Sequence, residues 1–337
     1  MRRWLLSISL LVALGACAGP QVTDLGASTS TPPDRTPTPN GSPTPTASAT
    51  PAGGPLCAST GSVTGQGGTL DCLSFAIVGD TRPPSIDDTS NYPKAIITKI
   101  YEDLESASGG RPSFAVATGD YQFSSPTGSQ ATTQIGYYLT AQSHFSGTVF
   151  HTMGNHECTG AADSNCTGSV SGNNNYAAFM SKMVSPLGFS KPYFSVHVQA
   201  SDASWTAKFV FVAANAWDAT QASWLQTEMG KPTTFTFVIR HEGNNASAPG
   251  LTPSNHIIAQ FPYTLLLVGH THTFDYVPTS REVVVGIGGA PLVSSYNYGY
   301  VMVRQRADNA IDLSVVDYQS GAVMKHFVVK TDGTPTT

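Results

Sequence analysis

Six short apolar stretches, rich in β-branched and aromatic residues, constrain the fold of this chain more than any other feature. Near-continuous apolar runs of this length are typical of strands buried on both faces of a sheet. Residues at helical spacing lie between several of them, and alternating strands and helices indicate an α/β fold. The predicted strands cover residues 73–80, 114–120, 148–157, 208–217, 235–242 and 263–272.

The helices are predicted between these strands and none after the last one. Apolar periodicity places them at residues 96–104, 132–145, 176–183 and 221–229. After residue 272, the runs REVVVGIGG, YGYVMVRQ, IDLSVVDY and VMKHFVV predict successive strands of an antiparallel finish.

Polar residues with metal-binding groups stand where five of the predicted strands end. Ligands of open α/β sheets bind outside the carboxyl ends of strands, so five such ends favour one shared site over chance. The residues are Asp80, Asp120, Asn155 with His156, His241, and His270 with His272.

The mixture of donor types indicates which metals such a site would hold. Carboxylate, amide and imidazole donors suit zinc, manganese or iron, rather than calcium or a metal that prefers thiolates. In GHTH at 269–272, alternate residues of an extended segment point the same way, roughly 6–7 Å apart. His270 and His272 could then reach two ions about 3.5–4 Å apart.

The first seventeen residues have the composition of an export signal. Arg2 and Arg3 precede an apolar run that is too short to span a bilayer permanently. The run ends at Leu14-Gly15-Ala16-Cys17, which is similar to a bacterial lipobox. Residues 1–17 are therefore predicted to be a lipoprotein-type signal peptide, with Cys17 lipidated and tethering the chain to a membrane surface. The alternative is an ordinary signal cut near Ala16, with Cys17 incidental.

Residues 18–56 are mostly Thr, Pro, Ser, Ala and Gly and predict a disordered linker, because they have little apolar surface to bury. Residues 57–337 are long enough for one large domain. Only 12% of the chain is charged and its net charge is −5, which argues against a nucleic-acid-binding surface. We expect a monomer that is exported and lipid-anchored in the bacterial cell envelope.

Four cysteines remain after Cys17, and an even number in an exported chain predicts two disulfides. Pairing of sequence neighbours favours Cys57–Cys72 and Cys158–Cys166 among the three possible arrangements. A four-cysteine zinc site is the alternative, but the close cysteine pairs of such sites are missing.

Taken in order, these motifs resemble those of the calcineurin-like metallophosphoesterases. The matching segments are GD at 79–80, GD at 119–120, GNHE at 154–157, His241 after a strand, and GHTH at 269–272. The finish IGGAPLVSSYNYGYVMV is similar to exported bacterial relatives of the purple acid phosphatase branch. The resemblance implies an α/β fold of four layers, in which two mixed β-sheets pack face to face and are flanked by helices.

The resemblance also implies a function and a role for each residue. A pair of divalent or trivalent transition-metal ions, iron, manganese or zinc, would activate water to hydrolyse a phosphomonoester or phosphodiester outside the cytoplasm. His156 would stabilise the transition state or protonate the leaving oxygen. The metal ligands would be Asp80 and His272 for the first ion, Asn155, His241 and His270 for the second, and Asp120 for both.

The sequence departs from the family pattern at the first metal. Arg82 stands where most relatives have a histidine, and Phe123 stands where purple acid phosphatases have a tyrosine. Tyr121 or Gln122 could contribute a donor instead, although Tyr121 should face away from Asp120 if the strand continues.

Arg82 itself has two interpretations. Its guanidinium could bind a phosphate oxygen, which would make it catalytic. Alternatively it forms a salt bridge to Asp80 or Glu157 in a metal-poor site. The second interpretation leaves open a catalytically weak phosphate- or metal-binding surface lipoprotein, or an adhesion or scaffold module, on the same fold.

Overall fold

The computed structural model describes residue 56, residues 59–159 and residues 174–336. The predicted signal peptide and lipobox, and the predicted linker up to residue 55, lie outside this part of the chain. Cys72 and Cys158 are buried, but their expected partners Cys57 and Cys166 are not among the described residues, so the pairing stays a prediction. Within the described ranges, no helix is long and apolar enough to cross a membrane.

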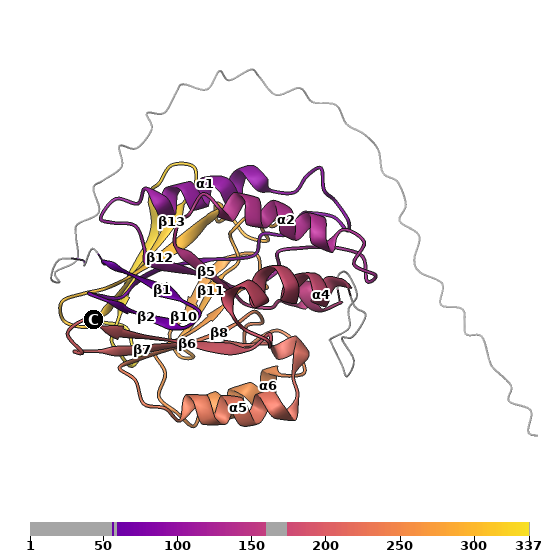
Figure 1. Cartoon of the computed structure of the whole chain (residues 1–337). Coiled ribbons are helices and arrows are strands. Elements are labelled where there is room, and N and C mark those ends of the chain that lie inside the picture. Colours follow the sequence, from indigo (N-terminus) through magenta and orange to yellow (C-terminus); the bar gives the residue numbers. More distant parts are fainter. Residues whose placement is uncertain (1–55, 57–58, 160–173, 337) are drawn as a thin grey trace, which may run out of the picture. The chain divides into compact units, whose positions relative to one another are not determined.

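Strands of the described residues build two β-sheets (Figure 1). They are β1 (Gly61–Thr64), β2 (Gly67–Leu70), β3 (Ser74–Val78), β4 (Phe114–Ala117), β5 (Thr148–His151), β6 (Phe194–Ala200), β7 (Thr206–Val212), β8 (Phe235–Arg240), β9 (Leu265–Val268), β10 (Phe274–Val277), β11 (Glu282–Val285), β12 (Gly299–Gln305), β13 (Ile311–Asp317) and β14 (Val323–Val329). One sheet has the order β1-β2-β6-β7-β8-β9-β11-β10 and the other β14-β13-β12-β3-β4-β5. Neighbouring strands are parallel from β3 to β5 and from β7 through β8 and β9 to β11.

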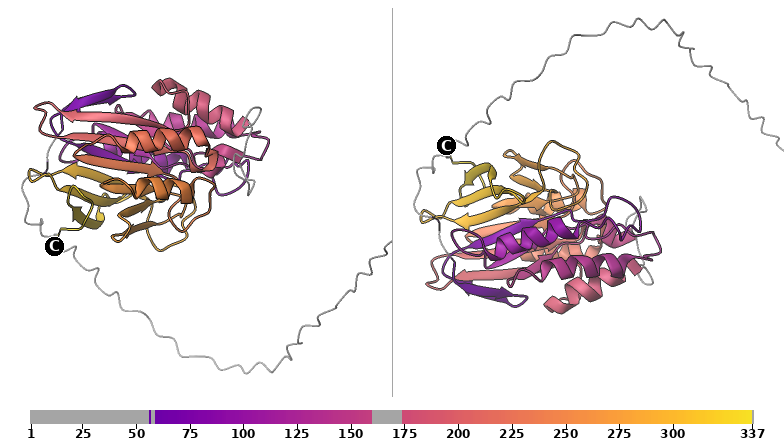
Figure 2. Two further views of the ribbon diagram at one scale, coloured as in Figure 1. Left: turned by 90° about the horizontal axis from the view of Figure 1, so that it is seen from below. Right: turned by 90° about the horizontal axis from the view of Figure 1, so that it is seen from above.

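Helices cover both outer faces of this pair of sheets, which makes four layers (Figure 2). They are α1 (Lys94–Glu105), α2 (Ala131–Gln142), α3 (Asn155–Thr159), α4 (Asn174–Phe179), α5 (Ala219–Met229) and α6 (Leu251–Ile258). α1 and α2 lie over the six-stranded sheet, and α5 and α6 over the eight-stranded sheet. The predicted α/β fold with two mixed sheets and flanking helices is confirmed.

Aromatic side chains join the two sheets at their shared inner face. The Phe75 ring packs edge-on against Phe209 at 5.0 Å and Phe237 at 5.1 Å, and Phe114 meets Phe209 at 5.0 Å. All four are fully buried. Burying one such side chain contributes about 1.5–3 kcal/mol, so this cluster is a principal reason that the sheets pack face to face.

The sequences of α1 and α5 explain how the first packs and where the second begins. In α1 the buried side chains Ile97, Ile100, Tyr101 and Leu104 recur every three or four residues, which puts them on one face. α5 begins after Asp218, whose side chain accepts a hydrogen bond from the backbone N–H of Gln221 at 2.6 Å, as an N-cap should.

Some predicted elements were wrong or missing. β11 does not belong to an antiparallel finish: it lies parallel to β9 in the eight-stranded sheet, and only β12–β14 form the antiparallel meander. α6 was missed because its Thr-Pro-Ser-Asn stretch resembles a loop, although Pro253 lies in the first turn, where proline is tolerated. The predicted helix at 176–183 is instead α4 followed by a π-turn at Met180–Val184.

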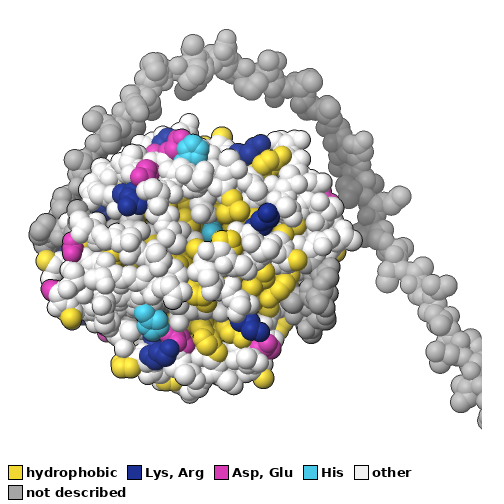
Figure 3. Space-filling view, viewed as in Figure 1, with side chains coloured by type: hydrophobic (Ala, Val, Ile, Leu, Met, Phe, Trp, Pro, Cys, Tyr) yellow, Lys and Arg dark blue, Asp and Glu magenta, His cyan; other side chains and the backbone are white. Residues whose placement is uncertain are grey.

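Charged side chains are sparse on the described surface. On the face drawn in Figure 3, basic and acidic groups are scattered singly or in small mixed clusters. Ionisable groups are instead concentrated in the interior, where parallel strands of the two sheets have their carboxyl ends.

Candidate metal centre

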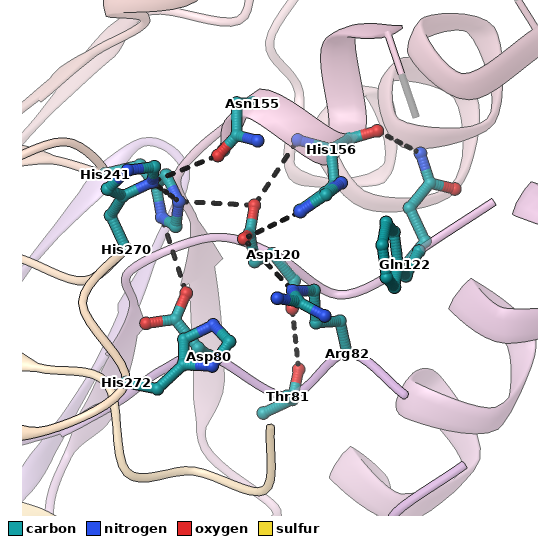
Figure 4. A network of polar contacts seen from close by, with 12 residues as sticks. Asp80, Thr81, Arg82, Asp120, Gln122, Asn155, His156, His241, His270 and His272 are labelled. Atoms are coloured by element: carbon teal, nitrogen blue, oxygen red, sulfur yellow. Dashed lines mark hydrogen bonds and ion pairs between the residues drawn. The ribbon is translucent and has the colours of Figure 1, made fainter. Parts of the chain in front are cut away.

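Seven predicted site residues come together at the carboxyl ends of parallel strands (Figure 4). Asp80 follows β3, Asp120 follows β4, Asn155 and His156 follow β5, His241 follows β8, and His270 and His272 follow β9. The first three strands belong to one sheet and the last two to the other. The donors of the two sheets therefore face each other across the seam between them.

Four donor atoms of this group form a compact cluster. Nε2 of His241 lies 3.2 Å from Oδ1 of Asp120 and 3.3 Å from Nδ1 of His270. That same Nδ1 lies 3.2 Å from Oδ1 of Asn155. Donor atoms that share a tetrahedral ion with bonds of about 2.0–2.1 Å lie roughly 3.3–3.4 Å apart. Each of these three successive spacings therefore fits two donors that share one metal ion.

Backbone carbonyls orient two of the histidines. Nδ1 of His241 lies 2.8 Å from the carbonyl oxygen of Thr118, and Nδ1 of His272 lies 2.7 Å from that of Pro291. A carbonyl oxygen can only accept, so each Nδ1 carries the proton. Nε2 is left as the nitrogen that can bind a metal, which is the usual arrangement of a metal-binding histidine.

Among the described residues, Asp80 is a carboxylate with unusually few polar contacts for its depth. It is fully buried, and neither of its carboxylate oxygens has a hydrogen-bond partner. Its oxygens lie near the donors of Asp120 and His241, all within 4.8 Å of one another. Its ion-pair contact is with Nδ1 of His241, 3.7 Å from Oδ1 of Asp80. A buried carboxylate without a hydrogen bond is costly unless cations compensate it, so Asp80 fits a metal ion beside the cluster.

Burial and neighbouring charges strongly shift the pKa values of these groups. Burial raises the pKa of Asp80 to about 7. Burial opposes ionisation of Asp120 as well, but the nearby His241 and His156 outweigh it and lower the pKa of that carboxyl. Burial would lower the pKa of His241, yet the Asp120 carboxylate reverses the effect and raises it. Burial and the neighbouring His241 lower the pKa of His270 to about 4.

Two of the donor residues have left-handed backbone conformations, which set the direction of their side chains. Asp120 has φ 56° and His270 has φ 68°, a region that costs a non-glycine residue roughly 1–2 kcal/mol. Gly119 has φ 112°, and a Cβ there would come within 2.6 Å of Nδ1 of His241. The expectation that His270 and His272 extend the strand was wrong, because β9 ends at Val268 and tight turns follow.

Glu157 connects the loops that carry the donors. Oε2 accepts hydrogen bonds from the backbone N–H groups of Asp120 and Gly154, each at 2.9 Å. Oε1 accepts from those of Tyr121 at 2.8 Å and Gln122 at 3.3 Å. One buried carboxylate thus fixes both the loop after β4 and the loop after β5.

Arg82 pairs with a different carboxylate from those expected. Nε of Arg82 lies 3.7 Å from Oδ2 of Asp120, so the predicted partners Asp80 and Glu157 were wrong. Nε has no hydrogen-bond partner, and the guanidinium lies over the Phe123 ring, 4.4 Å from its centre. Glu157 is not available to Arg82, because both of its oxygens accept hydrogen bonds from backbone N–H groups.

The two residues considered as substitute ligands are engaged elsewhere. The hydroxyl of Tyr121 donates to the carbonyl oxygens of Ala117 and Thr152, both at 3.1 Å, so its ring faces away from Asp120 as expected. The amide nitrogen of Gln122 donates to the carbonyl oxygen of His156 at 3.0 Å, whereas its Oε1, the atom that could bind a metal, is buried without a hydrogen-bond partner.

Some contributors had no sequence signal. The carbonyl oxygens of Thr118 and Pro291 orient histidines, but any residue supplies a carbonyl, so side-chain identity could not reveal them. Phe123 was noted only as a missing ligand, yet its ring contacts both Arg82 and His156.

Comparison with known proteins agrees with this geometry. Residues 73–274 match the model of the calcineurin-like phosphoesterase family. The chain belongs to this family. The resemblance of the motifs is thereby confirmed, and the matched residues include every predicted donor. Calcineurin-like phosphoesterases bind divalent metals, and the Asp80, Asp120 and His241 group is a candidate site for one.

Solved structures of similar fold have little sequence in common with this calcineurin-like phosphoesterase. A purple acid phosphatase from yellow lupin (Lupinus luteus) seeds is 16% identical with a TM-score of 0.54, and the alignment covers 81% of this chain and 57% of that one. A 5'-nucleotidase from Candida albicans is 12% identical with a TM-score of 0.41, covering 79% and 54%. Vacuolar protein sorting 29 from Cryptosporidium parvum is 12% identical with a TM-score of 0.36, covering 77% and 96%.

The chain thus spans little more than half the length of the lupin phosphatase. No curated protein matches the sequence.

Proposed function

We propose that this protein is a metal-dependent hydrolase of phosphate esters, acting on monoesters or diesters through a dinuclear centre. The observation that carries the proposal is the cluster of four donor atoms with successive spacings of 3.2–3.3 Å, next to a buried carboxylate that has no hydrogen-bond partner. Such an arrangement is costly without cations and well suited to holding them.

Each ion has its own set of protein donors in this proposal. When bound, two iron, manganese or zinc ions would polarise a phosphoryl oxygen and lower the pKa of a bound water. The first ion would be held by Asp80, Asp120 and His272, and the second by Asp120, Asn155, His241 and His270.

Two further side chains act on the substrate. Nε2 of His156 lies 3.7 Å from Oδ2 of Asp120, and the side chain is 13% exposed, so it can reach both the centre and solvent. We assign it the role of protonating the leaving oxygen. Arg82, 17% exposed at the same carboxylate, binds a phosphoryl oxygen through its guanidinium.

Hydrolysis of chromogenic phosphate mono- and diesters by the purified protein, with Mn²⁺, Zn²⁺ or iron added, tests the proposal. We expect metal-dependent turnover that Asp120→Asn abolishes. His156→Ala should lower turnover by about 10²–10⁴-fold without loss of metal. His144→Ala is the control, since this half-exposed histidine pairs only with Glu102. Loss of metal from His156→Ala would make His156 a ligand and contradict its assignment.

A second candidate is a catalytically weak phosphate- or metal-binding protein. The ion pair between Arg82 and Asp120 favours it, because a guanidinium beside the bridging carboxylate competes with a cation. Metal-loaded protein that binds inorganic phosphate but hydrolyses no ester in the panel would select this candidate.

The location belongs to the proposal as well. The apolar N-terminal run and the lipobox-like segment ending at Cys17 support an exported lipoprotein of the bacterial cell envelope, anchored by lipid and monomeric. Cys17→Ala should release the protein from the membrane fraction. Membrane association that survives this change would contradict the lipid anchor.

A further inference from the structure

Two donor groups converge on one oxygen at the mouth of the metal centre. Nε of Arg82 and Nε2 of His156 each lie 3.7 Å from Oδ2 of Asp120, which is too long for a hydrogen bond. Arg82 lies in the loop after β3, and His156 lies in the short helix α3 that follows β5. Some other part of the protein must therefore set their mutual position.

The Phe123 ring contacts both groups. The guanidinium carbon of Arg82 lies 4.4 Å from the ring centre, and the imidazole of His156 lies 4.6 Å away at an interplanar angle of 61°. A guanidinium over an aromatic face is attracted by the ring quadrupole, and an edge-on imidazole is a favourable aromatic pair. The ring thus restricts the position of both groups at once.

The backbone of Phe123 is itself fixed. Its N–H donates to Oε1 of Gln134 at 2.7 Å, and its carbonyl oxygen accepts from the backbone N–H of Asp87 at 2.8 Å. Gln134 belongs to α2 and is fully buried. The backbone that carries the ring is therefore held by α2 and by Asp87, as a positioning residue requires.

We propose that Phe123 positions Arg82 and His156 so that both act on the same phosphoryl group. This inference rests on the proposed function, and it assigns the aromatic ring a role as a spacer between the phosphate-binding cation and the proton donor. Phe123 touches neither substrate nor metal in this role.

Phosphate binding and ester hydrolysis by the Mn²⁺-loaded full chain test the proposal. Phe123→Leu keeps apolar bulk but removes the ring, and should raise the Kd for inorganic phosphate and lower kcat, each by about 5–10-fold, at unchanged metal content. Phe123→Trp keeps an aromatic face without adding an oxygen donor and should recover most of that loss. Phe261→Leu, a partly buried phenylalanine packed near α5 and α6, is the matched control and should change neither value.

Coupling between variants separates positioning from a merely structural role. In an Arg82→Gln background, Phe123→Leu should weaken phosphate binding by no more than about 2-fold further. In a His156→Ala background it should lower kcat by no more than about 2-fold further. Losses that multiply in both backgrounds, or unchanged phosphate affinity and kcat in Phe123→Leu, would overturn the proposal. If the wild-type protein hydrolyses no ester, the proposed function is wrong. Non-additive effects of Phe123→Leu and Arg82→Gln on phosphate binding would still support the link from Phe123 to Arg82.

Discussion

The carboxylate of Glu157 illustrates how one residue supports a site that it does not enter. It accepts hydrogen bonds from four backbone N–H groups, three in the loop that carries Asp120 and one at Gly154, next to Asn155. Glu157→Gln would replace one acceptor oxygen by a donor that faces N–H groups. We expect the free energy of unfolding to fall by about 2–4 kcal/mol, and metal affinity by roughly 10–100-fold.

Urea denaturation and metal titration measure these two effects of Glu157→Gln. The control is Glu105→Gln, since Glu105 is 39% exposed and bonds only the nearby Ser146 and Arg111. Unchanged metal affinity in Glu157→Gln would show that the loops keep their geometry without this carboxylate.

The two metal sites should differ in affinity. The first lacks the donors that relatives have at the positions of Arg82 and Phe123, and the Arg82 guanidinium adds like-charge repulsion near Asp120. We expect one equivalent of metal to survive dialysis and the other to be lost. Arg82→His should retain the second equivalent in elemental analysis, whereas Arg111→His, at an exposed arginine, should not. Two tight equivalents in the wild type would mean that another residue completes the first site.

At the residue scale, the sequence predicted which side chains meet but not how they are held. Asp80, Asp120 and His241 could be found because metal-binding side chains at strand ends are conspicuous. The partner of Arg82 could not be predicted, because several carboxylates lie within reach of a long side chain. The sequence reveals neither that backbone N–H groups occupy Glu157 nor that the guanidinium lies over the Phe123 ring.

At the element scale, α5 carries a buried glutamate at its C-terminal end that pairs with two half-exposed basic side chains. Oε1 of Glu228 lies 2.6 Å from Nε2 of His197 on β6, and Oε2 lies 2.5 Å from Nζ of Lys231. Burial would raise the pKa of Glu228, but its hydrogen bonds to His197, Lys231 and Ser195 outweigh burial and lower it to about 2.

Acid stability should therefore depend on Glu228. A carboxyl with a depressed folded pKa stabilises the protein above its ordinary pKa of 4.5, and the contribution is lost as pH falls from there through about 2. Glu228→Gln should lower stability at pH 7 by about 1–3 kcal/mol and flatten the decline in urea midpoint between pH 4.5 and 2. Glu102→Gln, at a half-exposed glutamate, should leave the decline as it is. An equally steep decline in Glu228→Gln would rule out this carboxyl as its source.

Elements with strong apolar runs were predictable, and those that depend on their neighbours were not. β3, β4, β8 and β9 are fully buried and mostly apolar, and their apolar runs predicted them. β6 was not predicted, because its buried residues alternate with more exposed ones and form no continuous apolar run. The sheet to which β11 belongs could not be predicted, since its apolar run suits either sheet.

At the scale of the whole molecule, the metal centre ties the two sheets together. Asp80 and Asp120 belong to the six-stranded sheet, and His241 and His270 to the eight-stranded one. Bound metal should therefore stabilise the entire fold. At a metal concentration 100 times Kd the gain is about 2.7 kcal/mol, which corresponds to a rise in Tm of roughly 5–10 °C. Calorimetry with and without chelator measures it, and Asp120→Asn should reduce the rise. A Tm that saturating metal leaves unchanged would mean that the folded protein binds the ions no better than the unfolded chain does.

The division of the donors between the sheets also determines when the site can form. Asp80 and His272 are separated by most of the folded domain in the sequence, and contacts between distant segments form late because closing long loops costs entropy. Neither sheet alone has a complete set of donors, so a nascent or partly folded chain has no competent centre. We therefore expect metal to bind after one sheet has packed on the other. The ions available in the compartment where folding is completed would then be the first to reach the site.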